Sequence, residues 1–302
     1  MIGAYATPQA FRSALESRLR NLAQQQGTDL RRLYRRAAFE RLLARLFADA
    51  APPWLLKGGY ALELRFDERA RATLDLDLTV PDPAQLTPVD QATPDSWTEL
   101  AYARLQQAAA RPLEDGFEFW LSRPQLERTG APGGGLRCLV EARLAGRTFA
   151  KFHLDVGLGD AVLRPADWVE HTSLLAFAGI PATRVALYPV EQQFAEKLHA
   201  YTFPWDTHSS GTRENTRVKD LVDLVLLITS GLLDSERVRS ALLATFQTRG
   251  THALPDVLPE PPATWVESYA ALAQEFALPA TTLDAAVTLV SDYWREIGFA
   301  SR

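Results

Sequence analysis

Two aspartates stand two residues apart in the segment 73–80, TLDLDLTV, where polar and apolar residues alternate. Alternation of this kind predicts a half-buried strand with two faces. The polar face holds Thr73, Asp75, Asp77 and Thr79, and the face toward the core holds Leu74, Leu76, Leu78 and Val80. Two neighbouring carboxylates repel one another unless a cation lies between them, and Mg²⁺ suits that place because it binds a few carboxylates together with phosphate oxygens. The pattern indicates a metal-binding pair, Asp75 and Asp77, with a solvated strand face as the alternative.

A pair of glycines precedes this strand. The apolar run 54–56 leads into Lys57-Gly58-Gly59, and residues 60–64 offer apolar positions on one helical face. Glycine permits positive φ and close backbone approach, so the amides of Gly58 and Gly59 can face a phosphate at the start of a helix. Amides for phosphates and carboxylates for a metal together predict a site for a triphosphate.

A third carboxylate is expected from a later strand. Residues 117–121, 136–144 and 148–156 have strand patterns, and Ala145-Gly146 is typical of a tight hairpin between the last two. The last strand should present Phe149, Lys151, His153 and Asp155 on one face. If this strand lies beside residues 73–80, Asp155 adds a carboxylate to the pair, and three carboxylates around two metal ions can support in-line attack on a phosphate.

The elements around these strands are expected to be helical. Helices are predicted over residues 8–26, 28–48, 97–110, 190–203, 213–228, 234–247, 263–276 and 282–297. Glu196 and Lys197 lie on the fourth of these helices. On the fifth, Arg217, Asp220 and Asp223 recur every three residues, and Lys219 stands four residues before Asp223. Solvent-facing ion pairs are the alternative to a functional role for these side chains.

The central motif resembles the first motif of DNA polymerase β-type nucleotidyltransferases: a hydrophobic strand, Gly-Gly, a helix and a strand with Asp-x-Asp. In detail, two segments resemble the AbiEii-type nucleotidyltransferase toxins of bacterial type IV toxin–antitoxin systems. They are Lys57-Gly58-Gly59-x-Ala61-Leu62 and Arg71-x-Thr73-x-Asp75-Leu76-Asp77. Two later segments are similar to further motifs of that family, Glu196-Lys197-Leu198-x-Ala200 and Arg217-x-Lys219-Asp220-Leu221-x-Asp223-Leu224. The second glycine replaces a serine common in the superfamily, and the spacer before Asp75 is longer than its commonest form; both features fit the toxin branch.

The resemblance implies an α+β fold: a polymerase β-like mixed sheet with N-terminal helices and a C-terminal helical domain. We expect an N-terminal helical segment at 1–50, a catalytic domain at 51–188 and a helical domain at 189–302. Mg²⁺ or Mn²⁺ would be held by Asp75, Asp77 and Asp155, the last of which could instead act as base. An NTP donor would be bound by Lys57, Gly58, Gly59, Arg71, Thr73, Lys197, Arg217 and Lys219. In the family the helical-domain lysine contacts the donor's phosphates and a later acid is needed for activity; they correspond to Lys197 and to Asp220 or Asp223.

By resemblance the acceptor is RNA, at the 3′ end of tRNA. The consequence would be blocked translation and growth arrest of the abortive-infection kind, countered by a cognate antitoxin protein. The arginine-rich first fifty residues favour RNA if they form a phosphate-contact surface, and an exposed helix face is the alternative. Two other functions stay open: nucleotidyl or phosphoryl transfer to a protein, and a non-catalytic module that binds nucleotide. An inactive relative would tend to lose a carboxylate or lysine, and here the set is complete.

Composition limits the remaining classes. The chain is 47% hydrophobic and 23% charged, an ordinary composition for a soluble globular protein, and its net charge of -5 gives no global argument for nucleic-acid binding. It has no apolar run of membrane-spanning length and no leader-like N-terminus, so we expect a cytoplasmic protein. The single cysteine, Cys138, excludes a disulfide within the chain and a cysteine-rich zinc site. Positive charge is almost entirely arginine, and the only lysines are Lys57, Lys151, Lys197 and Lys219.

Overall fold

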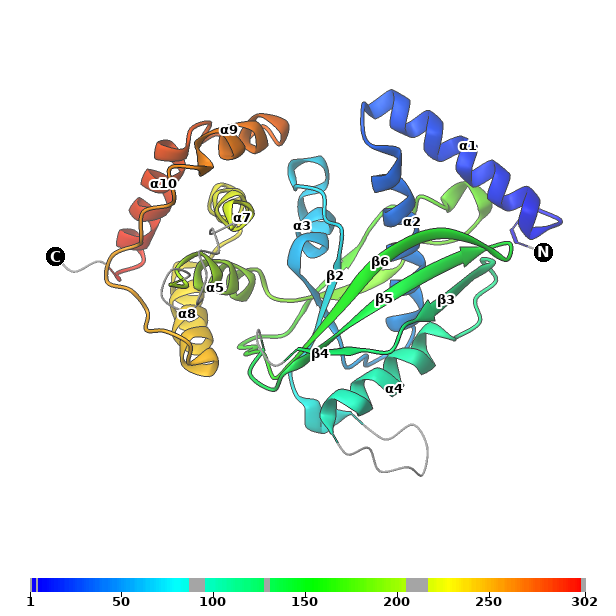
Figure 1. The fold of residues 1–302 in the computed structure, drawn as a ribbon, viewed down its shortest axis with the longest axis horizontal. Helices are drawn as coiled ribbons and strands as arrows, with labels where there is room; N and C mark the ends of the chain where they lie inside the picture. The colour runs from blue at the N-terminus through cyan, green and yellow to red at the C-terminus, as the bar shows by residue number, and fades with distance from the viewer. Residues whose placement is uncertain (1, 4, 87–95, 128–130, 205–216, 300–302) are drawn as a thin grey trace. The chain divides into compact units, whose positions relative to one another are not determined.

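The computed structural model describes residues 2–3, 5–86, 96–127, 131–204 and 217–299, which form two compact units (Figure 1). The first unit comprises Met1–Leu64, Ala72–Asp160 and Ala166–Leu187. The second comprises Arg65–Arg71, Ala161–Pro165 and Tyr188–Arg302. No helix within the described ranges is long and apolar enough to cross a membrane.

The first unit is built on one mixed sheet. Its strands are β1 (Leu55–Lys57), β2 (Leu76–Val80), β3 (Phe117–Leu121), β4 (Gln125–Glu127), β5 (Gly135–Leu144), β6 (Arg147–Leu158), β7 (Asp167–Glu170) and β8 (Arg184–Leu187). Their order is β3-β5-β6-β2-β1-β8-β7, with β4 paired to β5. The β2–β6 and β1–β8 pairs are parallel and the others antiparallel, which confirms the predicted α+β class with a mixed sheet.

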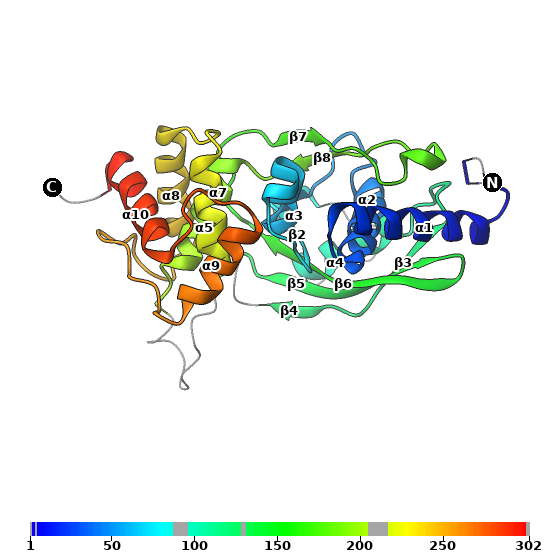
Figure 2. The same ribbon diagram turned by 90° about the horizontal axis from the view of Figure 1, so that it is seen from above.

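Helices cover one face of this sheet because each has an apolar stripe. They are α1 (Pro8–Gln26), α2 (Leu30–Leu46), α3 (Gly58–Phe66) and α4 (Trp97–Ala109). Figure 2 shows them between the β3–β5–β6 end of the sheet and the β7–β8 end. Phe39 of α2 packs edge to face against Phe152 of β6, with 4.7 Å between ring centroids. Side-chain oxygens of Thr7 and Asp29 cap α1 and α2.

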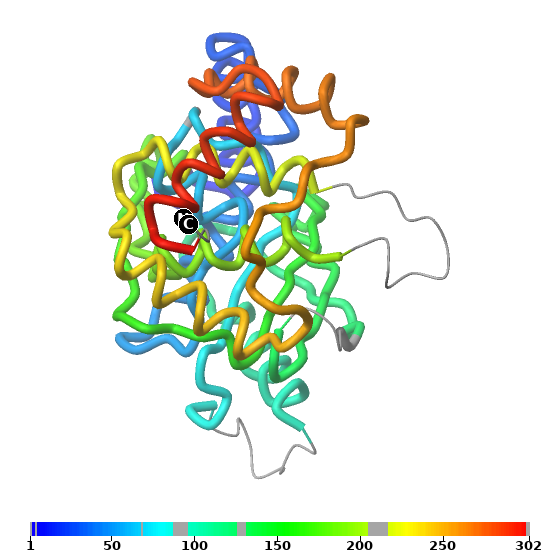
Figure 3. Tube along the Cα trace, turned by 90° about the vertical axis from the view of Figure 1, so that its left-hand side faces the viewer, coloured from blue at the N-terminus to red at the C-terminus, as the bar shows by residue number. Residues whose placement is uncertain are grey.

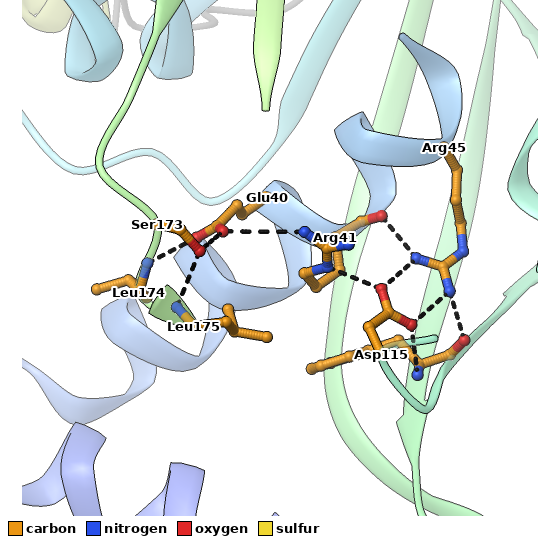
Figure 4. A network of polar contacts seen from close by, with 8 residues as sticks. Glu40, Arg41, Arg45, Asp115, Ser173, Leu174 and Leu175 are labelled. Carbon is orange, nitrogen blue, oxygen red and sulfur yellow. Dashed lines mark hydrogen bonds and ion pairs between the residues drawn. The ribbon is translucent and has the colours of Figure 1, made fainter. Parts of the chain in front are cut away.

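A buried charge network fixes α2 to the sheet (Figure 4). Asp115 accepts hydrogen bonds from Arg41 at 2.7 Å and from Arg45 at 2.8 Å. Burial alone would raise the pKa of Asp115, but the hydrogen bonds and positive charges of Arg45 and Arg41 outweigh it, and the pKa is lowered. Glu40, which precedes Arg41 on α2, accepts hydrogen bonds from Ser173 and from the Leu174 amide.

Because of such contacts, the arginine-rich N-terminus is mostly engaged within the protein. Arg12 donates to the carbonyls of Leu144, Arg147 and Thr148, and the guanidinium of Arg36 lies 2.7 Å from His171. Exposed positions are held by Arg18, Arg20 and Arg31. These contacts weaken both expectations for this segment, the phosphate-contact surface and the solvent-facing arginine stripe.

The second unit is helical, as predicted, and can be followed in Figures 1 and 3 from yellow-green to red. Its helices are α5 (Val190–Tyr201), α7 (Val218–Thr229), α8 (Ser235–Arg249), α9 (Trp265–Glu275) and α10 (Leu283–Glu296). Helix α5 packs on α7 and α8, and α7 packs on α9 and α10. Residues 213–216 of the predicted helix 213–228 lie outside the described residues.

The strand around the two aspartates is shorter than predicted. It begins at Leu76, so Asp75 precedes the strand, and Leu74 is 59% exposed instead of lying in the core. Thr79, predicted on the polar face, is fully buried. Thr79 is buried because β2 lies between β1 and β6 in the sheet. Leu74 is exposed because the pairing of β2 with β6 begins only at Leu76.

The predicted face of β6 is wrong at Phe149. A bulge interrupts the β5–β6 ladder here: Ala150 pairs with Ala142, Thr148 pairs with Arg143, and Phe149 is the extra residue between them. The bulge turns the Phe149 ring into the core, where it is 4.7 Å from the ring of Tyr34. Lys151, His153 and Asp155 keep the alternating face.

Candidate active site

A row of charged residues crosses four neighbouring strands of the first unit. Lys57 of β1 pairs with Asp77 of β2, Asp77 pairs with Asp155 of β6, and Asp155 pairs with Arg137 of β5. Directly paired residues project their side chains to the same face of a sheet. The predicted approach of Asp155 to the Asp77 strand is therefore confirmed, since the two are backbone neighbours.

Asp75 joins this row from the loop before β2. Arg137 donates from Nη2 to Oδ2 of Asp75 at 3.2 Å, and its Nη1 lies 3.3 Å from Oδ2 of Asp155. His153 Nδ1 is 3.5 Å from the other oxygen of Asp75. Sequence reasoning missed Arg137, although strand alternation places it on this face, because its strand neighbour could not be known.

The backbone of Gly58 makes room for Asp77. Gly58 has φ +67°, and a Cβ built on it would lie 2.0 Å from Oδ2 and 2.6 Å from Cγ of Asp77. An L-residue would therefore be strained here and would also collide with the carboxylate. Gly59 is buried in the first turn of α3. The glycine turn thus brings the start of α3 against the Asp77 side chain.

Lys57 has a partner that the sequence did not suggest. Its Nζ donates to Oδ2 of Asp160 at 2.5 Å, and Asp160 is buried just beyond the end of β6. The nearby Gly157 leaves space for this pair, since a Cβ there would lie 2.9 Å from the Asp160 oxygen. Lys57 therefore compensates a buried carboxylate beside the row.

The loop that carries Asp75 is fixed by a buried acid on α3. Glu63 accepts from the Thr73 amide at 2.8 Å and from Arg32 at 3.1 Å. The Thr73 hydroxyl in turn donates to the Asp75 carbonyl at 3.2 Å. Thr73 thus shapes the approach to Asp75, and Glu63 is a further residue that sequence reasoning missed.

The donor chemistry of this row fits a hard divalent cation. Asp75, Asp77 and Asp155 supply carboxylate oxygens, the ligands that Mg²⁺ and Mn²⁺ accept. Among the described residues no group of three or more His, Cys, Asp and Glu side chains is gathered closely enough to hold a metal ion. Instead, the guanidinium of Arg137 joins two of the three carboxylates.

The other predicted site residues form a separate cluster in the second unit. Lys197 of α5 donates to Asp220 at 2.9 Å and lies 2.9 Å from Asp223, both on α7. Arg71 binds both oxygens of Asp223 at 2.9 Å, and Arg217 donates to Asp220 at 3.4 Å. Both aspartates are buried, so the alternative of solvent-facing ion pairs is wrong for them.

Opposite charges keep this cluster ionised. Burial alone would lower the pKa of Lys197, but Asp220 and Asp223 outweigh it and raise the pKa. Burial would likewise raise the pKa of Asp223, and Lys197 and Arg71 lower it instead. Lys219 is exposed, and within the described part of the chain Asp223 pairs with Lys197 and Arg71, so the expected Lys219–Asp223 ion pair is wrong.

Comparison with known proteins gives one family. A family model described as nucleotidyl transferase AbiEii toxin, Type IV TA system, matches residues 41–293, a range that includes both clusters. No curated protein matches the chain. Among solved structures, MenT4, the nucleotidyltransferase toxin Rv2826c from Mycobacterium tuberculosis H37Rv, is 17% identical, with a TM-score of 0.49 over 86% of this chain and 88% of that chain.

Proposed function

Because the chain belongs to the AbiEii family of nucleotidyltransferase toxins of type IV toxin–antitoxin systems, we propose that it transfers a nucleoside monophosphate from an NTP to RNA. The observation that carries the proposal is the pairing of Asp77 with Asp155, beside Asp75 and against the glycine turn. Nucleotidyl transfer needs carboxylates grouped next to a phosphate-binding backbone, and this site offers both features.

In the proposed mechanism Asp75, Asp77 and Asp155 would hold Mg²⁺ or Mn²⁺. The metal would offset charge on the triphosphate and lower the pKa of the acceptor hydroxyl. Asp155, which is partly exposed, could instead accept the hydroxyl proton at a carboxylate oxygen. The amides at the start of α3, Gly58 and Gly59, would face the donor phosphates.

Basic residues would complete donor binding. Lys57 limits the negative charge around the carboxylates through Asp160. We propose Lys197 as the lysine for the donor phosphates, because its neighbours keep it protonated and the family motif has a lysine at this point. Arg71, Arg217 and the exposed Lys219 are proposed as further donor contacts, and Asp220 or Asp223 as the essential later acid.

The acceptor and the consequence are inferred from the family. We propose the 3′ end of tRNA as the acceptor, which would block translation and arrest growth, and a cognate antitoxin that prevents this. The described residues of the arginine-rich N-terminus give little additional support for RNA, because Arg41 and Arg45 are buried with Asp115.

The test is incubation of the purified protein with Mg²⁺, bulk tRNA and each α-labelled NTP in turn. Total cell protein serves as a parallel acceptor. Asp75→Asn and Asp77→Asn should abolish labelling of tRNA. Asp82→Asn is the matched control, since Asp82 follows β2 on the same segment, is exposed and caps a short turn that asparagine can also cap.

Each outcome has one meaning. Label on tRNA that depends on Asp75 and Asp77 supports the proposal and identifies the nucleotide. Label only on protein means that the acceptor is a protein and not RNA. Bound NTP without label on either acceptor favours a nucleotide-binding module and contradicts the proposed transfer.

A further inference from the structure

We propose that Arg137 is a built-in counter-ion of the candidate active site, which joins Asp75 to Asp155 in the absence of metal and which a divalent cation must displace. This inference rests on the proposed function, because it concerns the carboxylates assigned there to the metal. It makes Arg137 a positioning residue that sets how tightly the site binds its cation.

The geometry of Arg137 is that of a bridge. One terminal nitrogen is 3.2 Å from Asp75 and the other is 3.3 Å from Asp155. The backbone of Arg137 is held opposite Asp155 by the β5–β6 ladder, so the guanidinium reaches both carboxylates from a fixed base. A planar group with several donors can contact two carboxylates at once, as a cation between them would.

The local charge favours a divalent cation over the guanidinium. Four carboxylates, Asp75, Asp77, Asp155 and Asp160, stand beside two basic residues, Lys57 and Arg137, so these six residues carry two excess negative charges. Lys57 is bound to the buried Asp160. A divalent ion offers Asp75 and Asp155 twice the charge of the Arg137 guanidinium.

Exposure makes the bridge replaceable. The side chains of Arg137, Asp75 and Asp155 are 31%, 36% and 23% exposed. By contrast, Arg45 and Asp115 are 2% and 1% exposed, which is typical of a permanent structural pair. Ion pairs open to solvent contribute little stability, so the Arg137 bridge can open when a better cation arrives.

Displacement implies a direct competition. A cation that binds only when Arg137 has moved away shows an affinity reduced by the fraction of molecules in which the bridge is open. Removing the guanidinium removes that reduction, so Arg137→Gln should bind the cation more tightly. A purely structural role predicts the reverse, because a disturbed site binds metal less tightly.

The experiment measures Mn²⁺ binding to the nucleotide-free full chain by electron paramagnetic resonance, without any activity readout. We expect Arg137→Gln to lower the Kd for Mn²⁺ about tenfold, the effect of a bridge that is closed in about nine molecules of ten. The matched control is Arg143→Gln, an arginine on the same strand that pairs with Glu141 at 2.7 Å and should leave the Kd unchanged. An unchanged or raised Kd in Arg137→Gln overturns the proposal.

Two further variants keep the test decisive. Arg137→Lys retains one positive charge for folding, but its compact ammonium spans two carboxylates poorly, so its Kd should lie between those of wild type and Arg137→Gln. A Kd for Arg137→Lys above that of wild type contradicts competition.

Adding Asp75→Asn to Arg137→Gln should remove the gained affinity for Mn²⁺. If Asp75→Asn leaves Mn²⁺ binding of the wild type unaltered, the metal assignment of the proposed function fails, whatever Arg137 does.

Discussion

Asp77 and Asp155 are direct partners on two parallel strands, although they stand 78 positions apart in the chain. Neighbouring strands lie about 4.8 Å apart, so the two side chains leave the sheet next to one another. The glycine turn and Lys57 lie on one side of this pair and Arg137 on the other. The pair is therefore the centre from which the proposed chemistry can be tested.

Replacing Asp155 should separate catalysis from folding. In Asp155→Asn we expect nucleotidyl transfer to fall about a hundredfold or more, because a charged metal ligand or base is lost. The melting temperature should change little, because the substitution removes repulsion from Asp77 as well as attraction to Arg137. Transfer assays and thermal unfolding monitored by circular dichroism measure both. Glu118→Gln, an exposed acid on β3, is the control, and equal activity of the two variants would contradict the assignment.

Replacing Gly58 by alanine should displace Asp77. Gly27→Ala is a matched control, since Gly27 has a similar φ of +62° but nothing within 4 Å of a built Cβ, whereas Gly58 has Asp77 at 2.0 Å. Each variant should lose about 1 kcal/mol from backbone strain. Only Gly58→Ala should also lose transfer activity. Urea unfolding gives the stabilities, and a fully active Gly58→Ala would show that Asp77 tolerates the added methyl.

The two acids of α7 should differ in their structural importance. Asp223→Asn leaves Arg71 and Lys197 facing a neutral amide in a buried site, which should cost about 3 to 5 kcal/mol. Asp220→Asn should lower the free energy of unfolding less, because Lys197 still pairs with Asp223 and because Arg217 is partly exposed to water. Urea denaturation ranks the two variants, and a smaller loss in Asp223→Asn would contradict this order.

The Asp115 network should make stability depend on acid pH. The pKa of Asp115 is lowered in the folded protein. Its contribution to the free energy of unfolding is therefore fully present above the unfolded pKa of about 3.9, and it is lost as the pH falls through the folded pKa. The stability difference between wild type and Asp115→Asn should therefore be largest above about pH 4 and shrink below it. Urea midpoints from pH 2.5 to 7 measure this dependence.

Asp292→Asn is the control for this experiment. Asp292 is an exposed acid that pairs with Arg295 one helical turn away, so its replacement should shift the urea midpoints little at any pH. A constant difference between wild type and Asp115→Asn across the whole pH range would mean that the Asp115 charge is not coupled to folding.

Local pattern predicted most elements because apolar residues recur with the period of a helix or of a strand. The hairpin at Ala145-Gly146 formed as expected, with both residues at positive φ. The short strand β4 was missed, because a three-residue segment carries too little periodicity to be distinguished from a loop. The bulge at Phe149 was missed for another reason: it depends on the partner strand, which the local sequence does not specify.

The sequence by itself determined which side chains can do chemistry: the Asp-x-Asp pair, the glycine turn and Asp155, all recognisable from residue type and spacing. It also carried the family resemblance. Only the tertiary structure decided the partners of these side chains: Arg137 between Asp75 and Asp155, Asp160 on Lys57, and two buried aspartates on Lys197. The physical reason is that charge compensation acts through space over a few ångströms, and strand register and helix packing decide which distant residues come that close.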